Sequence, residues 1–316
     1  MKAITIYDTS ISTRNVGDEI IMDSVNKELS RIFYKRQIFR VPTHNYLTLG
    51  SYKCLRESEM SIVGGSNLLS SNMPFYQQWN VTPLDLLFSG EVILLGVGWW
   101  QYQKSPNIYT KFILNKMLSK KFIHSVRDGY TEKQLNNIGI KNVINTSCPT
   151  MWGLTKEHCE NIPPNKSNNV IFTLTDYNQS PDSDFEILKI LDSEYDKVGV
   201  WLQGSKDYEY LKSLNADHLV DEIIPARLAS FDEAISAADT EYVGTRLHAG
   251  IRSLQLKKRS LVLAVDNRGI EKKRDYNLHV INREDMSGLR LMISKKRKTE
   301  LNIDFNRIDK WRSQFY

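Results

Sequence analysis

The stretch GTRLHAGIRS, Gly244 to Ser253, carries the clearest fold signal in this chain. It follows TEYV, a short run typical of a buried strand, and it begins a helical pattern of apolar residues at Leu247, Ile251 and Leu254. A strand that turns directly into a helix presents backbone N–H groups and a positive helix end at the carboxyl edge of a parallel sheet. The stretch therefore predicts a strand–helix unit whose turn faces the side where such sheets bind ligands.

Two side chains of this turn are suited to chemistry. The guanidinium of Arg246 can hold a carboxylate or a phosphate through two parallel hydrogen bonds. The imidazole of His248 can carry a proton near neutral pH. A structural interpretation is equally open at this point, with Arg246 paired to an aspartate and His248 capping the helix.

Outward from this turn, short apolar runs alternate with helical patterns along the whole chain, which is typical of α/β folds with parallel sheets. The polar segment ENIPPNKSNN, residues 160–169, interrupts the alternation with two prolines, and the pattern restarts after it. We therefore expect two Rossmann-like α/β domains, residues 1–160 and 161–316, facing a ligand cleft.

Polar residues and glycines gather directly after the predicted strands. In the first half these candidates for the cleft are Asn15, Gly17, Asp18, Gly64, Gly65, Ser66, Asn67, Trp99 and Arg127, and in the second half they are Gln203, Asp266, Asn267 and Arg268. Because neighbouring parallel strands end at one edge of a sheet, we expect Arg246, His248, Asp266 and Arg268 to share one cavity. Three positive or protonatable groups around one cavity suit a small, multiply charged anion.

Some of these candidates have an ordinary structural alternative. Asp18 stands where a helix N-terminal acid is common, and a tryptophan such as Trp99 is more often core than an exposed platform for a sugar ring. Gly64, Gly65 and Ser66 form a turn that would let an anion approach the backbone, but they match neither the dinucleotide fingerprint nor the phosphate-binding P-loop.

Composition narrows the class of protein. The chain has 316 residues and a formal charge of +5, part of it in SKKRKTE, residues 294–300. Basic residues are neither striped nor interleaved with aromatics, which disfavours a nucleic-acid partner. The three cysteines form neither a metal spacing nor a paired framework, so we expect no metal and a reducing compartment. The chain begins with a strand-like run and its longest apolar run is too short to span a bilayer, so we expect a cytoplasmic protein.

Five motifs, in this order, resemble the polysaccharide pyruvyl transferase family: NVGDEII, VGGSNLL, SVRDGYT, GTRLHAGIRSL and LVLAVDNRGIEKKRDYNL, spread from Asn15 to Leu278. The resemblance implies a fold similar to the GT-B glycosyltransferases. It also implies transfer of the enolpyruvyl group of phosphoenolpyruvate to a sugar as a cyclic ketal, with release of phosphate and without a cofactor. By the family pattern, Arg246, Leu247 and His248 form the donor-binding motif and Arg127 is a second anion contact.

From this resemblance we expect His248 to be the general acid and base, and Asp266 to orient it or to deprotonate a sugar hydroxyl. Arg246 would bind the donor, with Gly64, Gly65 and Ser66 as further donor contacts, while Arg127 and Arg268 neutralise the departing phosphate. The acceptor would be a sugar or a lipid-linked glycan, and the basic run at residues 294–300 suggests peripheral contact with the inner face of a membrane. Two alternatives remain, a glycosyltransferase that uses a nucleotide sugar and a non-catalytic relative that binds sugars or anions.

Overall fold

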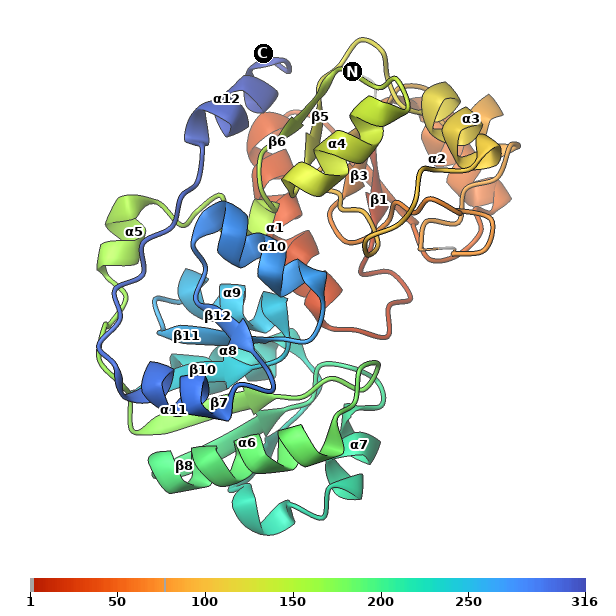
Figure 1. Ribbon diagram of the computed structural model, residues 1–316. Coiled ribbons are helices and arrows are strands. Elements are labelled where there is room, and N and C mark those ends of the chain that lie inside the picture. Colours follow the sequence, from red (N-terminus) through yellow and green to blue (C-terminus); the bar gives the residue numbers. More distant parts are fainter. Residues whose placement is uncertain (1–2, 77) are drawn as a thin grey trace. The chain divides into compact units, whose positions relative to one another are not determined.

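The computed structural model describes residues 3–76 and 78–316. The chain forms two compact units (Figure 1). Unit 1 comprises Met1–Thr13, Ile21–Trp152 and Ile303–Tyr316, and unit 2 comprises Arg14–Ile20 and Gly153–Asn302. The predicted domains, 1–160 and 161–316, differ from these units in three segments, because residues 14–20 and 153–160 belong to unit 2 and residues 303–316 belong to unit 1.

Unit 1 is built on a parallel sheet of four strands in the order β2-β1-β3-β4, with a second parallel pair, β5-β6. Its strands are β1 (Ala3–Asp8), β2 (Ile38–Pro42), β3 (Ser58–Gly64), β4 (Val92–Leu95), β5 (His124–Val126) and β6 (Val143–Asn145). Its helices are α2 (Leu49–Glu57), η1 (Asp85–Leu87), α3 (Ile108–Met117), α4 (Gly129–Asn137), η2 (Pro149–Met151) and α12 (Phe305–Ser313), and the chain passes from unit 2 into unit 1 within α1 (Gly17–Ile32).

Unit 2 is built on a parallel sheet of six strands in the order β12-β11-β10-β7-β8-β9. Its strands are β7 (Asn169–Thr173), β8 (Lys197–Trp201), β9 (Glu222–Ile224), β10 (Thr240–Gly244), β11 (Ser260–Ala264) and β12 (Val280–Asn282). Its helices are α5 (Lys156–Glu160), α6 (Pro181–Glu194), α7 (Asp207–Ser213), η3 (Asp217–Leu219), α8 (Leu228–Ser236), α9 (Leu247–Gln255), α10 (Asn267–Tyr276) and α11 (Met286–Ser294).

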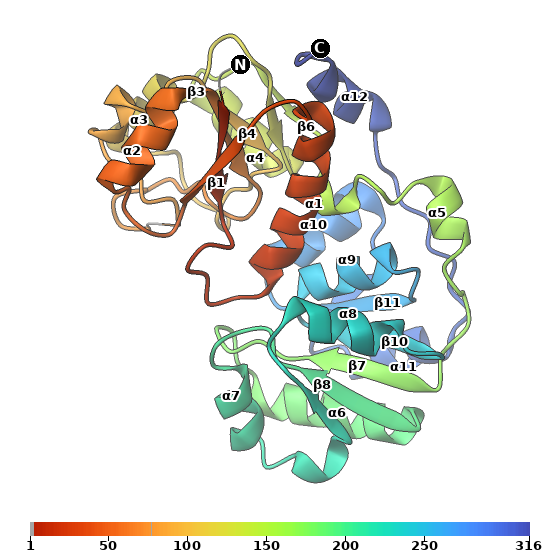
Figure 2. The same ribbon diagram turned by 180° about the vertical axis from the view of Figure 1, so that it is seen from behind.

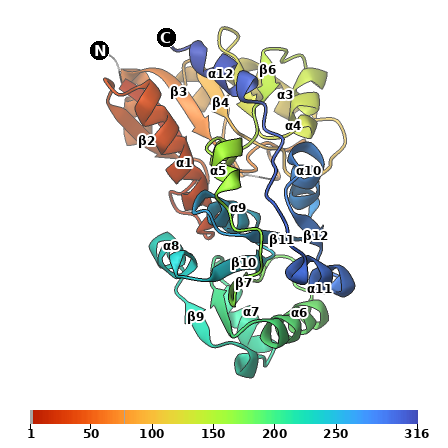
Figure 3. The ribbon, with the colours of Figure 1, turned by 90° about the vertical axis from the view of Figure 1, so that its left-hand side faces the viewer.

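Helices cover both faces of the sheet of unit 2 (Figure 3). On one face, α6 and α11 pack against alternate strand residues such as Phe172 and Val200. On the other face, Phe231 of α8 lies edge-on to Tyr242 of β10 at 6.4 Å. Strands buried on both faces are nearly continuously apolar, which is why the short apolar runs could be recognised in the sequence. The predicted α/β class with parallel sheets is confirmed.

No helix in the described part of the chain combines the length and the apolar character that crossing a bilayer requires.

Candidate functional site

The candidate site of unit 2 lies where the order of its strands reverses. From β7 the chain continues to β8 and β9 on one side, whereas β10, β11 and β12 lie on the other. Loops that leave two adjacent strands in opposite directions open a crevice at the carboxyl end of the sheet, and ligands of such sheets bind there. A cavity of about 260 Å³ occupies this position, and we call it the strand-end cavity; its lining residues are Arg14, Asn15, Asp176, Tyr177, Gly204, Ser205, Lys206 and Arg246.

Arg246 is the best-anchored residue of this cavity. It is the N-cap residue of α9 and only 3% exposed. Its Nε donates to the carbonyl oxygen of Leu174 at 2.9 Å, and its Nη2 donates to Oδ1 of Asp176 at 3.0 Å and also to Asp207. The predicted pairing of Arg246 with a buried aspartate is therefore present. The same side chain also lines the cavity, so Arg246 has both the structural aspartate partner and the access to a cavity that a ligand contact requires.

Asp207 is fully buried and is held by backbone groups at the start of α7. It is the first residue of α7, and Oδ2 accepts from the backbone N–H groups of Gln203 at 3.0 Å and Gly204 at 2.6 Å. Two backbone donors therefore fix the orientation of this carboxylate beside the guanidinium of Arg246. Gly204 leaves the space that this arrangement needs, because a Cβ atom there would lie 2.9 Å from Asp207 Oδ1 and would collide with the guanidinium of Arg246.

Three predicted residues meet on another side of the cavity. Oδ1 of Asn15 accepts from the backbone N–H of Gly17 at 3.0 Å and from Nε2 of Gln203 at 2.7 Å. Two backbone hydrogen bonds, from Val16 to Gln203 and from Ser205 to Arg14, join the same loops at 3.0 Å each. The structure therefore brings together candidates that are 188 positions apart in the sequence.

Asp266 and Arg268 pair with each other after β11. Asp266 is the N-cap residue of α10, and its carboxylate accepts from the backbone N–H, Nε and Nη2 of Arg268 at 2.9, 2.9 and 2.5 Å. The ring of Tyr177 links this pair to the cavity, because its centroid lies 5.5 Å from Cζ of Arg268 and 5.2 Å from Cζ of Arg246. Asn267 is half-buried at the start of α10.

Leu247 and His248 follow Arg246 in the first turn of α9, where each is 7% exposed. His248 interacts with other groups of the protein. Its predicted role as an acid and base stays a prediction. Asp18, 7% exposed, lies in the first turn of α1, where its backbone N–H donates to the carbonyl of Asn15 at 3.0 Å. A carboxylate in that turn fits the structural alternative of a helix N-terminal acid.

The glycine turn after β3 makes room for a helix. A Cβ atom on Gly65 would collide with Ile21 of α1, and one on Gly64 would lie 2.9 Å from the sulfur of Met22. Gly65 and Ser66 both have positive φ angles, +60° and +58°, which turn the chain sharply at the end of the strand. Asn67 follows as a half-buried residue. Close packing of α1 explains why glycines stand here, and the contact of Gly64, Gly65 and Ser66 with the donor stays a prediction.

Arg127 and Trp99 are both interior residues of unit 1. Arg127 is 4% exposed, its Nε lies 3.4 Å from Oδ2 of Asp128, and its side chain fills the space over Gly98, which has no room for a Cβ atom. Arg127 thus belongs to unit 1, and its contact with the donor stays a prediction. Trp99 is 2% exposed and donates from Nε1 to Gln103 Oε1 at 3.0 Å. The interpretation of Trp99 as an exposed sugar platform is wrong, because its ring is enclosed in the core.

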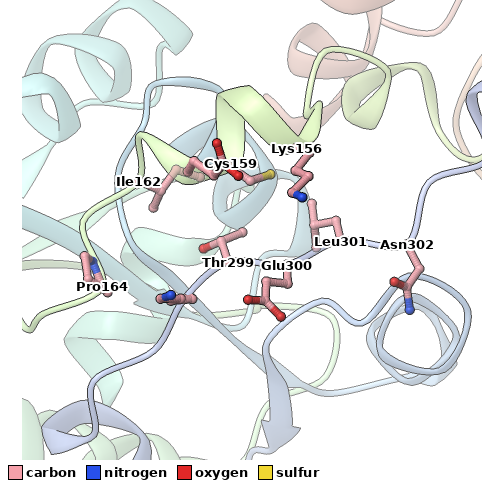
Figure 4. Close-up of a pocket in the computed structure, with 10 residues that line it drawn as sticks. Lys156, Cys159, Ile162, Pro164, Thr299, Glu300, Leu301 and Asn302 are labelled. Carbon is pink, nitrogen blue, oxygen red and sulfur yellow. The ribbon is translucent and has the colours of Figure 1, made fainter.

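A larger cavity of unit 2, about 550 Å³, lies between α5 and the extended segment Lys298–Asn302 (Figure 4). Its lining includes acidic, basic and apolar residues, and burial raises the pKa of the buried Cys159 thiol. None of the predicted site residues lines it. Within the described residues, no cluster of three or more His, Cys, Asp or Glu side chains could hold a metal ion in either unit.

A sequence model of the family described as "Polysaccharide pyruvyl transferase" matches residues 15–267, most of the chain. The chain belongs to the polysaccharide pyruvyl transferase family. The match begins at Asn15 and ends at Asn267, so it includes every lining residue of the strand-end cavity except Arg14. Membership of this family supports the conclusion that the protein is an enzyme that transfers pyruvyl groups in polysaccharide biosynthesis, with a glycan as acceptor.

The solved structures that are similar to this chain have very different sequences. The Escherichia coli heptosyltransferase WaaC with ADP-2-deoxy-2-fluoro heptose is 9% identical, with 83% of this chain and 88% of that chain covered and a TM-score of 0.42. The apo form of the lipopolysaccharide outer core galactosyltransferase WaaB is 8% identical, with 100% and 96% covered and a TM-score of 0.45. UDP-GlcNAc 2-epimerase from Neisseria meningitidis bound to UDP-GlcNAc is 13% identical, with 83% and 82% covered and a TM-score of 0.39. A search of curated proteins finds no match to this chain.

The acidic partners of Arg246 were not among the residues predicted from the sequence. Asp176 and Tyr177 follow β7 in the run LTDYN, and Asp207 follows β8 in the run QGSKD. Both runs show the signal that identified the other candidates, polar residues that follow closely after a strand. The strand order β10-β7-β8, which brings these two loops and the loop of Arg246 to one edge of the sheet, is not written in the sequence.

Proposed function

We propose that this protein transfers a pyruvyl group from phosphoenolpyruvate to a sugar of a glycan or a lipid-linked glycan precursor, forms a cyclic ketal and releases phosphate. The observation that carries the proposal is the group of three cationic side chains, Arg14, Lys206 and Arg246, around one cavity of a chain that belongs to this family. With Asp176 as the acidic lining residue, the lining carries an excess of positive charge, which suits a donor with a carboxylate and a phosphate.

The reaction adds one proton to the methylene carbon of phosphoenolpyruvate and removes one proton from each of two sugar hydroxyls. Protonation of the methylene carbon of phosphoenolpyruvate creates an oxocarbenium-like centre beside the carboxylate. One sugar hydroxyl adds to this carbon, phosphate leaves with the electrons of its C–O bond, and a second hydroxyl closes the ketal. One hydroxyl proton balances the proton placed on the methylene carbon, and the other leaves with phosphate.

We assign the proton transfers to His248 and donor binding to Arg246, with Leu247 as its neighbour in the motif. The pair of Asp176 and Asp207 around Arg246 supports a fixed guanidinium, because two carboxylates and a backbone carbonyl hold its orientation. Arg127 and Arg268 would neutralise charge on the departing phosphate, and Asp266 would orient His248 or deprotonate a sugar hydroxyl. The three free cysteines fit a reducing compartment, and we place the reaction in the cytoplasm, at the inner face of a membrane.

Donor binding is tested by calorimetric titration with phosphoenolpyruvate. We expect saturable binding, weakened about tenfold in Lys206→Ala because a charge-assisted contact is lost. Lys212→Ala is the matched control, since Lys212 is exposed on α7 and pairs with Asp217 instead. A second matched pair is Arg246→Lys and Arg252→Lys, because both arginines belong to the α9 region, are buried and pair with aspartate. Only Arg246→Lys should weaken the binding of phosphoenolpyruvate.

Turnover is tested by release of phosphate in the presence of a glycan mixture. We expect His248→Gln to abolish release while donor binding remains, and His218→Gln, an exposed histidine of unit 2, to leave it unchanged. Normal turnover of His248→Gln would refute the assignment of the acid and base. Binding of a nucleoside diphosphate in place of phosphoenolpyruvate would instead support a glycosyltransferase.

A further inference from the structure

Exposed apolar side chains are concentrated in one part of unit 1. Among the described residues, the exposed large hydrophobics other than tyrosine are Leu49, Phe75, Leu84, Leu87, Ile108 and Phe112 in unit 1, and Ile223, Ile270 and Leu291 in unit 2. Leu49 and Ile108 are each 87% exposed, and Phe75 is 81% exposed. Single exposed apolar residues are ordinary, but six of them within 64 consecutive positions indicate an interaction surface.

The elements that carry these six side chains are neighbours. Tyr52 of α2 donates to Asp85, the first residue of η1, at 2.7 Å, and its ring lies 4.6 Å from that of Phe88. Helix α3 contacts η1, and the hydroxyl of Thr110 in α3 accepts from the backbone N–H of Met73 in the loop before Phe75. Both views of the molecule show α2 and α3 beside each other at one end of unit 1 (Figures 1 and 2). We call this surface, defined by the six residues, the α2–α3 face.

Helix α3 is apolar on two sides. Ile113, Leu114 and Met117 are buried in the core of unit 1. Ile108 and Phe112 are four positions apart, so they stand on the same side of the helix one turn from each other, and they are exposed. The inner side accounts for the folding of this helix. The outer apolar pair has no such explanation within unit 1.

The sequence around α3 is entirely free of acidic residues. No Asp or Glu occurs from Val92 to Arg127, whereas the exposed lysines of this segment are Lys104, Lys111, Lys116, Lys120 and Lys121. On α2, Lys53 and Arg56 are exposed beside a cavity of about 480 Å³ that Leu49, Glu57 and Phe88 also line, and Nζ of Lys53 lies 4.0 Å from Oε1 of Glu57. Apolar side chains flanked by lysines are the pattern of surfaces that lie on anionic bilayers.

We propose that the α2–α3 face binds the surface of an anionic lipid bilayer, with Ile108, Phe112 and their apolar neighbours inserted among the lipids and the lysines against the headgroups. Charge complementarity favours this occupant over a second copy of the chain, because two copies of the same lysine-rich face repel each other. The membrane contact that the sequence suggested for the basic run at residues 294–300 stays a prediction, since Lys295, Lys296 and Lys298 are exposed. Arg297 in this run is 5% exposed and donates from Nη1 to the carbonyl of Ser260 at 3.1 Å.

The proposal does not depend on the donor or on the reaction, so it is tested with vesicles alone. The probe is sedimentation of the full chain with unilamellar vesicles of phosphatidylcholine containing about 30 mol% phosphatidylglycerol, beside pure phosphatidylcholine vesicles. We expect the protein to sediment with the anionic vesicles, and less of it at high salt because screening weakens the lysine contacts. Ile108→Ser with Phe112→Ser should reduce the bound fraction at least about fivefold. Lys104→Gln with Lys111→Gln should remove the preference for phosphatidylglycerol.

The matched control is Ile270→Ser with Leu291→Ser, which removes two apolar side chains of unit 2 that are 56% and 62% exposed. This variant should sediment like the wild type, and all variants should keep the wild-type melting temperature because the changed side chains are exposed. Wild-type protein that stays in the supernatant with anionic vesicles would overturn the proposal. An Ile108→Ser, Phe112→Ser variant that sediments with anionic vesicles like the wild type would also overturn it. The same holds if, without lipid, the wild type is a dimer in analytical ultracentrifugation and this variant is a monomer.

Discussion

At the scale of single residues, Gly204 shows why the cavity of unit 2 needs a backbone without a side chain. A Cβ atom on Gly204 would collide with the guanidinium of Arg246 and would lie 2.9 Å from Asp207 Oδ1 and 3.2 Å from Asp176 Oδ1. Gly204→Ala would therefore displace Arg246 or its partners. We expect it to destabilise the protein by about 1–3 kcal/mol, as other overpacking changes do, and to weaken phosphoenolpyruvate binding. Chemical denaturation and calorimetry measure the two effects.

Gly153→Ala is the control for this change, because a Cβ atom there meets no other atom within 4 Å. The expected change for this control is close to zero in both measurements. An alanine at position 204 that leaves both stability and donor binding intact would show that Arg246 is not held as described, and that the cavity tolerates a looser guanidinium.

At the scale of secondary-structure elements, one buried ion pair joins β10, β11 and the end of α11. Nη1 of Arg259 donates to both carboxylate oxygens of Glu241 at 2.7 and 2.8 Å, and Nη2 donates to the carbonyls of Met292, Ile293 and Lys295. Both partners are at most 2% exposed. Burial and the positive charge of Arg259 lower the pKa of the neighbouring Arg297 to about 10. The surroundings of this ion pair therefore disfavour further positive charge.

Glu241→Gln should therefore be strongly destabilising. The change leaves the guanidinium of Arg259 buried without a counter-charge, and we expect a loss of about 3–5 kcal/mol in the free energy of unfolding. Glu194→Gln is the control, because Glu194 pairs with Lys166 at 3.3 Å in a position 28% exposed and such pairs contribute less than about 1 kcal/mol. Equal losses for the two variants in urea unfolding would contradict the special weight given to the buried pair.

The same scale shows what the sequence could and could not predict. The strand–helix turn at Gly244–Ser253 and the α/β class follow from local periodicity, and the structure confirms both. The meeting of Asn15 with Gln203 depends on which distant loops pair, and no local pattern encodes that. Trp99 and Trp100 are adjacent in sequence but differ in burial, because Trp99 turns into the core while Trp100 packs on Tyr76 at 4.3 Å. The partners of Arg246 were missed for the same reason, since β7 and β10 are 66 residues apart.

At the scale of the whole chain, unit 1 is completed by its last residues. In α12, Ile308 and Trp311 are fully buried, and Arg312 donates to both carboxylate oxygens of Glu28 in α1 at 2.7 Å. The indole of Trp311 lies edge-on to that of Trp152 at 5.7 Å. A core assembled from both ends of the sequence cannot form until the entire chain is available, because the missing helix would leave this apolar surface in water.

This connectivity predicts where a C-terminal change is felt. Trp311→Ala should remove about 3–5 kcal/mol of stability, because a large buried side chain leaves a cavity. The loss should concentrate in unit 1, so hydrogen exchange should accelerate in β1, β3 and β4 while the strands of unit 2 keep their protection. Tyr316→Ala, at a side chain 83% exposed five positions later, is the control and should change neither. Uniform acceleration across both units would mean that the two cores unfold as one, and that the return of the chain into unit 1 stabilises the whole molecule rather than one of its parts.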